Sequence, residues 1–219
     1  MLAVIWKDLM LEARGRETIA SLFVLGLLVL VLFNFAVDVD ASNVTSVAPG
    51  VLWIAIVFSA TLALGRAFAI ERENGCMTGL LLAPIDRGSL YIAKLIVNVL
   101  VLLVFEILLL PFFFLLFGLQ VGSSLPHLAL VMLAGTVGLA AVGTLFALAA
   151  LGTRARELML PLLILPLQIP LLIAAVKASD LVLKGGSVLA LGSWGNLLLG
   201  FDVLFVTAGW LVFDYMTVD

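Results

Sequence analysis

The sequence predicts an all-α integral membrane protein that crosses the bilayer six times. Hydrophobic residues make up 64% of its 219 positions and charged residues only 11%, whereas a soluble domain is about half apolar and a quarter charged. The hydrophobic residues gather in six runs of the length that a spanning helix needs, roughly 17–25 residues. Segments of alternating polarity, which build a β-barrel, are absent from the sequence. We therefore expect a single transmembrane domain over residues 1–219.

An amphipathic helix is expected over residues 2–16, before the first span. Apolar side chains recur there at helical spacing, and charged side chains occupy positions between them. Such a helix lies in the membrane interface, with its apolar face in lipid and its charged face in water. The apolar positions are Leu2, Ile5, Trp6, Leu9 and Met10, and the charged positions are Lys7, Asp8, Glu12 and Arg14.

Six spans are expected to follow. No clear cleavage site with small residues follows the first run, so we expect it to remain as an anchor. The fourth run is rich in glycine and alanine, which let helix backbones approach closely. The fifth run carries three prolines, which should kink or interrupt it. The spans cover residues 19–36, about 47–68, about 90–117, about 128–151, 158–176 and about 197–215.

The basic residues indicate which side of the membrane each loop occupies. Nine of the 11 Lys and Arg residues fall in the N-terminal segment or near the loops after the second and fourth spans. Lys and Arg are enriched in cytoplasmic loops. These segments, and both termini, are therefore expected on the cytoplasmic side.

The segment "ERENGCMTGLLLAPIDRGS", residues 71–89, is charged at both ends and apolar in the middle. Asn74 or Gly75 can cap a short helix, which Pro84 would end because a residue before proline disfavours helix. The following helix, residues 87–117, would be about 46 Å long. That exceeds the roughly 30 Å of hydrocarbon, so its start should protrude. The sequence therefore predicts a rigid cytoplasmic knob suited to docking a soluble partner.

The motifs of the common enzyme classes are absent from the sequence. None of the four lysines stands in a GxxxxGK[ST] phosphate loop, and neither GxSxG nor HExxH occurs. One histidine cannot form a histidine-based metal site alone, and the single cysteine, Cys76, cannot form an intramolecular disulfide. We therefore expect no enzyme activity, no metal site and no cofactor bound by a motif.

Glu106 is a carboxylate near the middle of the third span. Acidic residues there cost roughly 2.5–3.5 kcal/mol on insertion scales, so they usually face a partner or a wet cavity. Two interpretations remain open: a place on a substrate path or helix interface, or a protonated glutamate hydrogen-bonded within the bundle. Gln168 and Arg66 are candidate polar partners in other spans.

His127, the one histidine, lies near the start of the fourth span, on the side away from the basic loops. It has two interpretations. It could ligate haem iron or another metal at the outer surface, or it could be a polar interface residue in a turn with Pro126.

Three stretches of the chain resemble a known family. Residues 71–84 resemble the E-x-E-x-G-x(4)-L-L-x-x-P coupling element of ABC-2-type exporter permeases. The stretch "APGVLWIAIVFSATLALGRAF" in the second span and "FDVLFVTAGWLVFDYM" near the end are similar to the CcmB family, the permease subunits of cytochrome c maturation exporters. Cys76 stands where many relatives carry threonine or serine, a departure that concerns only the start of the short helix.

The resemblance implies a permease subunit in the bacterial cytoplasmic (inner) membrane. Its expected partners are a CcmA-like ATPase that holds ATP and magnesium, CcmC-like and CcmD-like membrane proteins, a CcmE-like haem chaperone, and membrane lipid, but no nucleic acid. Haem would be handled by the complex, and we favour mechanical coupling over passage of haem through this chain. The ATPase-docking surface implied by the resemblance consists of Glu71, Glu73, Gly75, Leu80, Leu81, Leu82 and Pro84.

Two alternatives to this function are kept. One is an ABC-2 permease that exports a different lipid, glycan or drug. The other is a membrane scaffold that transports nothing and has no ATPase partner. A protruding charged knob favours the permease, because a scaffold does not need one.

Overall fold

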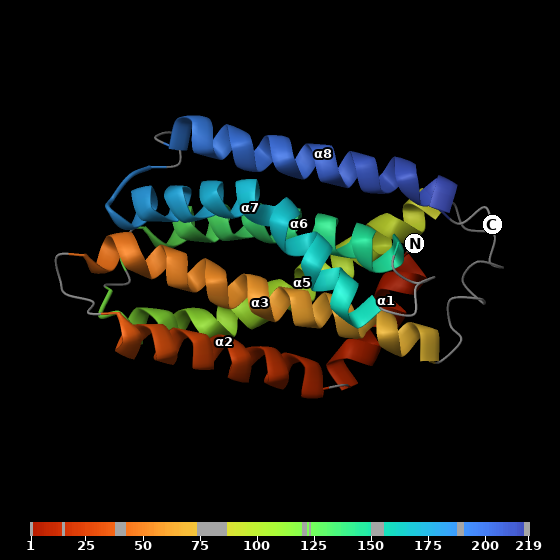
Figure 1. Cartoon of the computed structure of the whole chain (residues 1–219), viewed down its shortest axis with the longest axis horizontal. Helices are drawn as coiled ribbons and strands as arrows, with labels where there is room; N and C mark the ends of the chain where they lie inside the picture. The colour runs from red at the N-terminus through yellow and green to blue at the C-terminus, as the bar shows by residue number, and fades with distance from the viewer. Residues whose placement is uncertain are drawn as a thin grey trace.

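The computed structural model in Figure 1 is built from α-helices over almost all of the residues that it describes. Six of its helices are long and apolar enough to cross a membrane, which agrees with the six expected spans. The structure describes residues 2–14, 16–37, 43–73, 87–119, 122, 124–149, 156–187 and 191–216. The helices are α1 (Leu2–Arg14), α2 (Arg16–Ala36), α3 (Val44–Glu73), α5 (Arg87–Leu116), α6 (Leu125–Ala149), α7 (Arg156–Leu183) and α8 (Gly192–Met216).

The six long helices run side by side along the long axis of the molecule, with α8 and α2 at opposite edges in Figure 1. The short helix α1 lies at the end where α3 finishes and α5 begins, and both termini lie at that same end. We call it the docking end. This placement agrees with an even number of spans, which returns the chain to its starting side.

Helix α6 occupies the centre of the bundle and packs against α3, α5, α7 and α8. Its small residues make this possible. A methyl group added at Gly135 would overlap the ring of Trp53 from α3, one at Gly143 would overlap Leu64, and one at Gly138 would meet Leu171 of α7. The small residues of the fourth span therefore serve packing within one chain, as close helix approach requires.

Trp53 is the largest fully buried side chain among the described residues. Its indole nitrogen donates a hydrogen bond of 3.0 Å to the hydroxyl of Ser179 on α7. The indole ring lies against Gly135 of α6. Trp53 therefore joins three helices, α3, α6 and α7, through one side chain.

Helix α7 is longer than the expected span, because it continues to Leu183 and does not stop at residue 176. Two charged residues, Lys177 and Asp180, lie beyond the expected end and within the helix. Asp180 pairs with Lys184 one turn further along the chain, at 2.7 Å between Nζ and Oδ1. The prolines of α7 do not interrupt it. Figure 1 shows its ribbon changing direction, which agrees with the expected kink.

Candidate functional site

The docking end is where α3 ends and α5 begins. Helix α3 continues to Glu73, so Glu71 and Glu73 belong to its last turn. The helix therefore continues past the expected end of the second span, near residue 68, into the segment 71–89 that is expected on the cytoplasmic side. Within that range, 71–73 and 87–89 are helical. The other predicted docking residues lie outside the described residues: Gly75, Leu80, Leu81, Leu82 and Pro84.

Helix α1 is attached to the first turns of α5 by a buried ion pair. The ammonium nitrogen of Lys94 lies 2.6 Å from Oδ2 of Asp8, and both side chains are 8% exposed. The ammonium nitrogen of Lys7 lies 3.0 Å from the other carboxylate oxygen, Oδ1. The expectation that Asp8 faces water is therefore wrong. A lysine buried among helices needs a counter-charge, and Asp8 supplies it.

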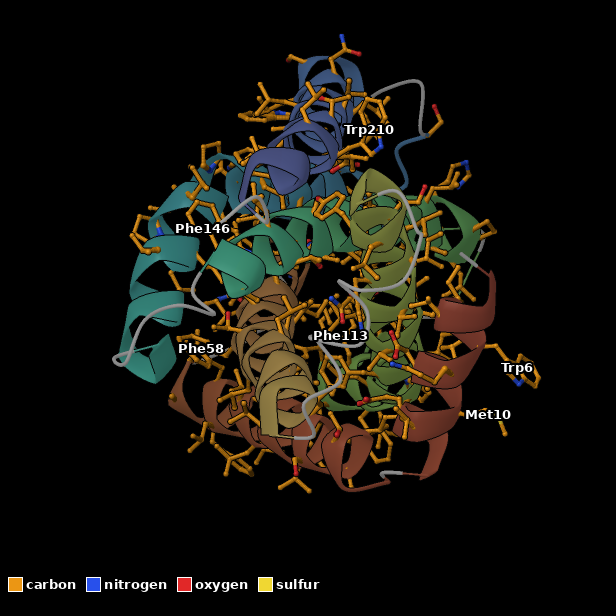
Figure 2. All side chains as sticks on the ribbon, turned by 90° about the vertical axis from the view of Figure 1, so that its right-hand side faces the viewer. Trp6, Met10, Phe58, Phe113, Phe146 and Trp210 are labelled. Carbon is orange, nitrogen blue, oxygen red and sulfur yellow. The ribbon has the colours of Figure 1, made fainter. Side chains whose placement is uncertain are left out.

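The outward face of α1 is apolar. Trp6 is 68% exposed, and Met10 and Leu11 are also exposed. Figure 2 shows Trp6 and Met10 projecting away from the bundle. Ile5 and Leu9, expected on the same face, instead pack against the core. The exposed face is suited to the membrane interface, where amphipathic helices place their aromatic and aliphatic side chains.

Glu12 lies where α1 meets α2. Burial raises the pKa of its carboxyl group, and a hydrogen bond with Thr18 of α2 partly opposes that shift by favouring the charged form. The nearby Asp8 carboxylate also raises the pKa of Glu12, because two like charges repel. The join between α1 and α2 is therefore polar and partly enclosed.

Tyr91 sits one turn before Lys94 and connects α5 to two other helices. Its side chain is fully buried. Its hydroxyl lies 3.2 Å from the carbonyl oxygen of Ala141 on α6 and 3.3 Å from that of Phe205 on α8, and it donates toward them. One side chain therefore holds three helix backbones together at the docking end.

Glu106 faces the central helix. The hydroxyl of Thr136 on α6 donates to its Oε1 at 2.5 Å. Two turns toward the docking end, the Asn98 amide donates to the hydroxyl of Thr144 at 2.8 Å. These two bonds share one antiparallel register between α5 and α6, because residues 98 to 106 on one helix run opposite residues 144 to 136 on the other.

The partners proposed for Glu106 from the sequence differ from the one observed. Gln168 instead donates to the carbonyl oxygen of Leu139 at 3.4 Å, so that expectation is wrong. The side chain of Arg66 lies outside the described part of the chain. Asp202 of α8 also reaches α6, next to Gly138. Glu106 is hydrogen-bonded inside the bundle at the interface of α5 and α6, a contact that both interpretations of this residue allow.

Replacing Thr136 with valine should destabilise the protein by about 1–3 kcal/mol, because the buried Glu106 carboxyl loses a hydrogen-bond donor. Thermal unfolding of the purified chain in detergent would measure this. Thr61→Val is a matched control, since the Thr61 hydroxyl bonds only the Val57 carbonyl in its own helix among the hydrogen bonds described here. Equal losses in both variants would contradict an energetic role for the contact with Glu106.

His127 lies in the first turn of α6, at the end of the bundle opposite the docking end. Its side chain is half-buried. Within the described residues, no group of three or more histidine, cysteine or acidic side chains could hold a metal ion. Ligation of haem iron by His127 needs no such group, because one histidine is enough beside the porphyrin nitrogens, and it stays a prediction.

The contacts that join α5 to its neighbours are not predicted by the sequence. A signal existed for one of them, since Lys94 lies just inside an apolar run and Asp8 is an acidic residue on a helix expected nearby. Lys94 also lies near the basic residues of the loop after the second span, so its position in the sequence does not by itself indicate a buried counter-charge. Tyr91 gave no signal, because tyrosine is common where a helix enters a membrane.

Comparison with known proteins identifies close relatives of this architecture. A family model described as "CcmB protein" matches residues 1–213. The chain is 33% identical to "Heme exporter protein B" of Paracoccus denitrificans, over 81% of each chain. It is 32% identical to the protein of the same name from Pseudomonas aeruginosa, over 90% of this chain and 89% of the relative. The Haemophilus influenzae protein of that name is 31% identical over 88% of each chain.

Proposed function

The chain belongs to the CcmB family, and we propose on that premise that it is the transmembrane permease subunit of an ABC transporter for cytochrome c maturation. The observation that carries the proposal is the match to the family model over residues 1–213. Relatives named as heme exporters, at about a third identity over most of their length, support the link to haem. The bundle of six membrane-length helices is the architecture that a permease subunit needs.

Energy would come from a separate ATPase subunit, CcmA-like, that binds ATP and magnesium. It would dock on residues 71–89, which α3 and α5 present at one end of the bundle. The proposed orientation places this end, with both termini, on the cytoplasmic side of the bacterial inner membrane, as the distribution of Lys and Arg favours. The apolar face of α1 would then lie in the cytoplasmic interface.

The output would be release of a haem-loaded, CcmE-like chaperone on the periplasmic side, with CcmC-like and CcmD-like proteins handling the haem. We favour transmission of ATPase movement over passage of haem through this chain. The single histidine lies at the end of α6 remote from the docking end. The polar contacts described above tie α5 to α1, α6 and α8, which suits a chain that transmits movement.

Gentle extraction of the native complex, followed by mass spectrometry of the proteins that remain bound, tests this function. A Walker-A ATPase together with a haem-handling membrane protein is the expected result. An ATPase alone would favour an ABC-2 exporter of another substrate. Recovery of neither, from a preparation shown to be intact, would contradict the proposal.

Single substitutions in the docking segment provide a residue-level test. Glu71→Lys, or Pro84→Gly, should reduce the ATPase recovered with the permease while leaving membrane insertion unchanged. Co-purification and ATP hydrolysis would be measured together. Asp180→Lys is the control, because Asp180 lies near the opposite end of the bundle in a partly exposed pair that contributes at most about 1 kcal/mol. Unchanged ATPase recovery in both docking variants would remove the assignment of this segment.

A further inference from the structure

The first three turns of α5 make contacts that distinguish them from the rest of the helix. They begin at Arg87, within the last three residues of the segment proposed to dock the ATPase, 71–89. Along these turns the helix meets α8, α6 and α1 in succession, through residues spaced about one turn apart. Each of these contacts depends on a specific pair of side chains or on a glycine.

Helices α5 and α8 interlock through two reciprocal pairs. The indole of Trp210 on α8 lies over Gly88 of α5, and a methyl group at Gly88 would overlap the indole nitrogen. The ring of Tyr91 on α5 lies over Gly209 of α8, and a methyl group at Gly209 would overlap the ring. Each helix therefore supplies one aromatic ring and one glycine that accepts the ring of the other. Figure 2 shows Trp210 beside the start of α5.

Polar contacts reinforce the interlock and extend it to the other helices. The Tyr91 hydroxyl reaches the backbones of α6 and α8. One turn further, Lys94 holds α1 through Asp8. Interlocking rings resist sliding along the helix axis, and a buried ion pair resists separation because either charge alone would be costly. Displacement of the start of α5 must therefore displace α8 and α1 with it.

Helix α8 packs on α5, α6 and α7, but the bundle encloses it less than it encloses the central helix. Only 17% of its spanning window is buried inside the bundle, compared with 67% for α6. Its outward face carries exposed apolar side chains, including Leu199, Val203 and Leu204. Fewer buried side chains therefore have to repack when α8 shifts than when α6 shifts.

We propose that Tyr91 and Lys94 are positioning residues that transmit displacement of the docking segment to α8 and to α1. This inference rests on the proposed function, since it requires an ATPase at residues 71–89. The direction of transmission is set by the chain itself: the docking segment leads directly into the first turn of α5. Tyr91 then passes the movement to α8 through Gly209, and Lys94 passes it to α1 through Asp8.

Trp210 provides a reporter for the test. The intact complex is prepared with Trp6→Phe and Trp194→Phe in this chain, and the signal from the same complex carrying Trp210→Phe is subtracted. Addition of a non-hydrolysable ATP analogue with magnesium should shift the Trp210 fluorescence. Tyr91→Phe keeps the ring and removes the hydroxyl, so the complex should still assemble. The shift should fall about two- to tenfold, the range expected for the loss of one buried hydrogen bond.

The same samples are assayed for bound ATPase, for ATP hydrolysis and for haem attachment to a c-type cytochrome. In Tyr91→Phe, and in the double variant Asp8→Leu with Lys94→Met, which removes the ion pair without leaving a buried charge unpaired, bound ATPase and hydrolysis should stay within twofold of wild type while haem attachment falls. Thr207→Val is the matched control, because its hydroxyl bonds carbonyls of its own helix, α8.

The outcomes separate this inference from the function on which it rests. A wild-type complex that contains no ATPase would overturn the proposed function and the inference together. A wild-type complex with bound ATPase but no Trp210 response would overturn the inference alone. The inference would also be overturned if Tyr91→Phe showed the same Trp210 response and the same haem attachment as wild type. Loss of bound ATPase in Tyr91→Phe would assign the residue to docking, and not to transmission.

Discussion

Replacing Trp53 with alanine is expected to destabilise the protein by about 3–5 kcal/mol, the range measured for deleting a large buried aromatic side chain. Trp53 is fully buried, contacts Gly135 of α6, and donates to Ser179 of α7. The deletion would leave a cavity where three helices meet and would remove the donor from the Ser179 hydroxyl. Collapse of the surrounding helices would recover only part of this loss.

Thermal unfolding in detergent would measure the effect of Trp53→Ala. Ser179→Ala separates the two contributions, since it removes the hydrogen bond and keeps the ring, and should cost about 1 kcal/mol. Trp6→Ala is the control for the loss of an indole from an exposed position, where changes usually stay within about 0.5 kcal/mol. Similar losses for Trp53→Ala and Trp6→Ala would show that Trp53 does not anchor the bundle.

Replacing Asp8 with alanine is expected to cost about 3–5 kcal/mol, as is typical when one member of a buried ion pair is removed. The Lys94 ammonium would lose the carboxylate that lies 2.6 Å away. Because Asp8 is on α1 and Lys94 on α5, the variant should also weaken the attachment of α1. Faster proteolysis within residues 2–14 would report that detachment separately from global unfolding.

A double variant tests whether the unpaired Lys94 ammonium causes the loss of stability in Asp8→Ala. Asp8→Leu combined with Lys94→Met removes both charges, and apolar pairs of similar volume often replace a buried ion pair without loss. The double variant should therefore be more stable than Asp8→Ala. Asp180→Ala is the control, because its pair with Lys184 is partly exposed and should contribute at most about 1 kcal/mol. If the double variant is as unstable as Asp8→Ala, the destabilisation comes from lost side-chain packing and not from an unpaired charge.

Much of the fold was predictable because a bilayer imposes simple rules on sequence. An apolar run of sufficient length must be a helix, since lipid offers no partner for backbone polar groups. The number of spans followed from this, whereas α1 was predictable from apolar residues that recur at helical spacing among charged ones. The ends of helices were less predictable. Helix α7 passes Lys177 and Asp180, because a charged residue near a helix end can be compensated by a neighbour one turn away.

The docking residues illustrate the limit of inference from a motif. The pattern at residues 71–84 is legible in the sequence, and the structure adds that Glu71 and Glu73 extend α3. The pattern carries no information about which helices would respond to a docked partner. The contacts to which we assign that response lie in the first turns of α5, at residues that no motif distinguishes.

The sequence by itself determined the class of protein, the number of spans and the family, because each is written in local composition and in residue order. Only the tertiary structure decided which side chains meet: Asp8 with Lys94, Trp53 with Ser179, and Glu106 with Thr136. Helices that are apolar on every side carry no periodic signal of the face they bury. Their partners are set by packing and by the few polar groups that must find one another inside the bundle.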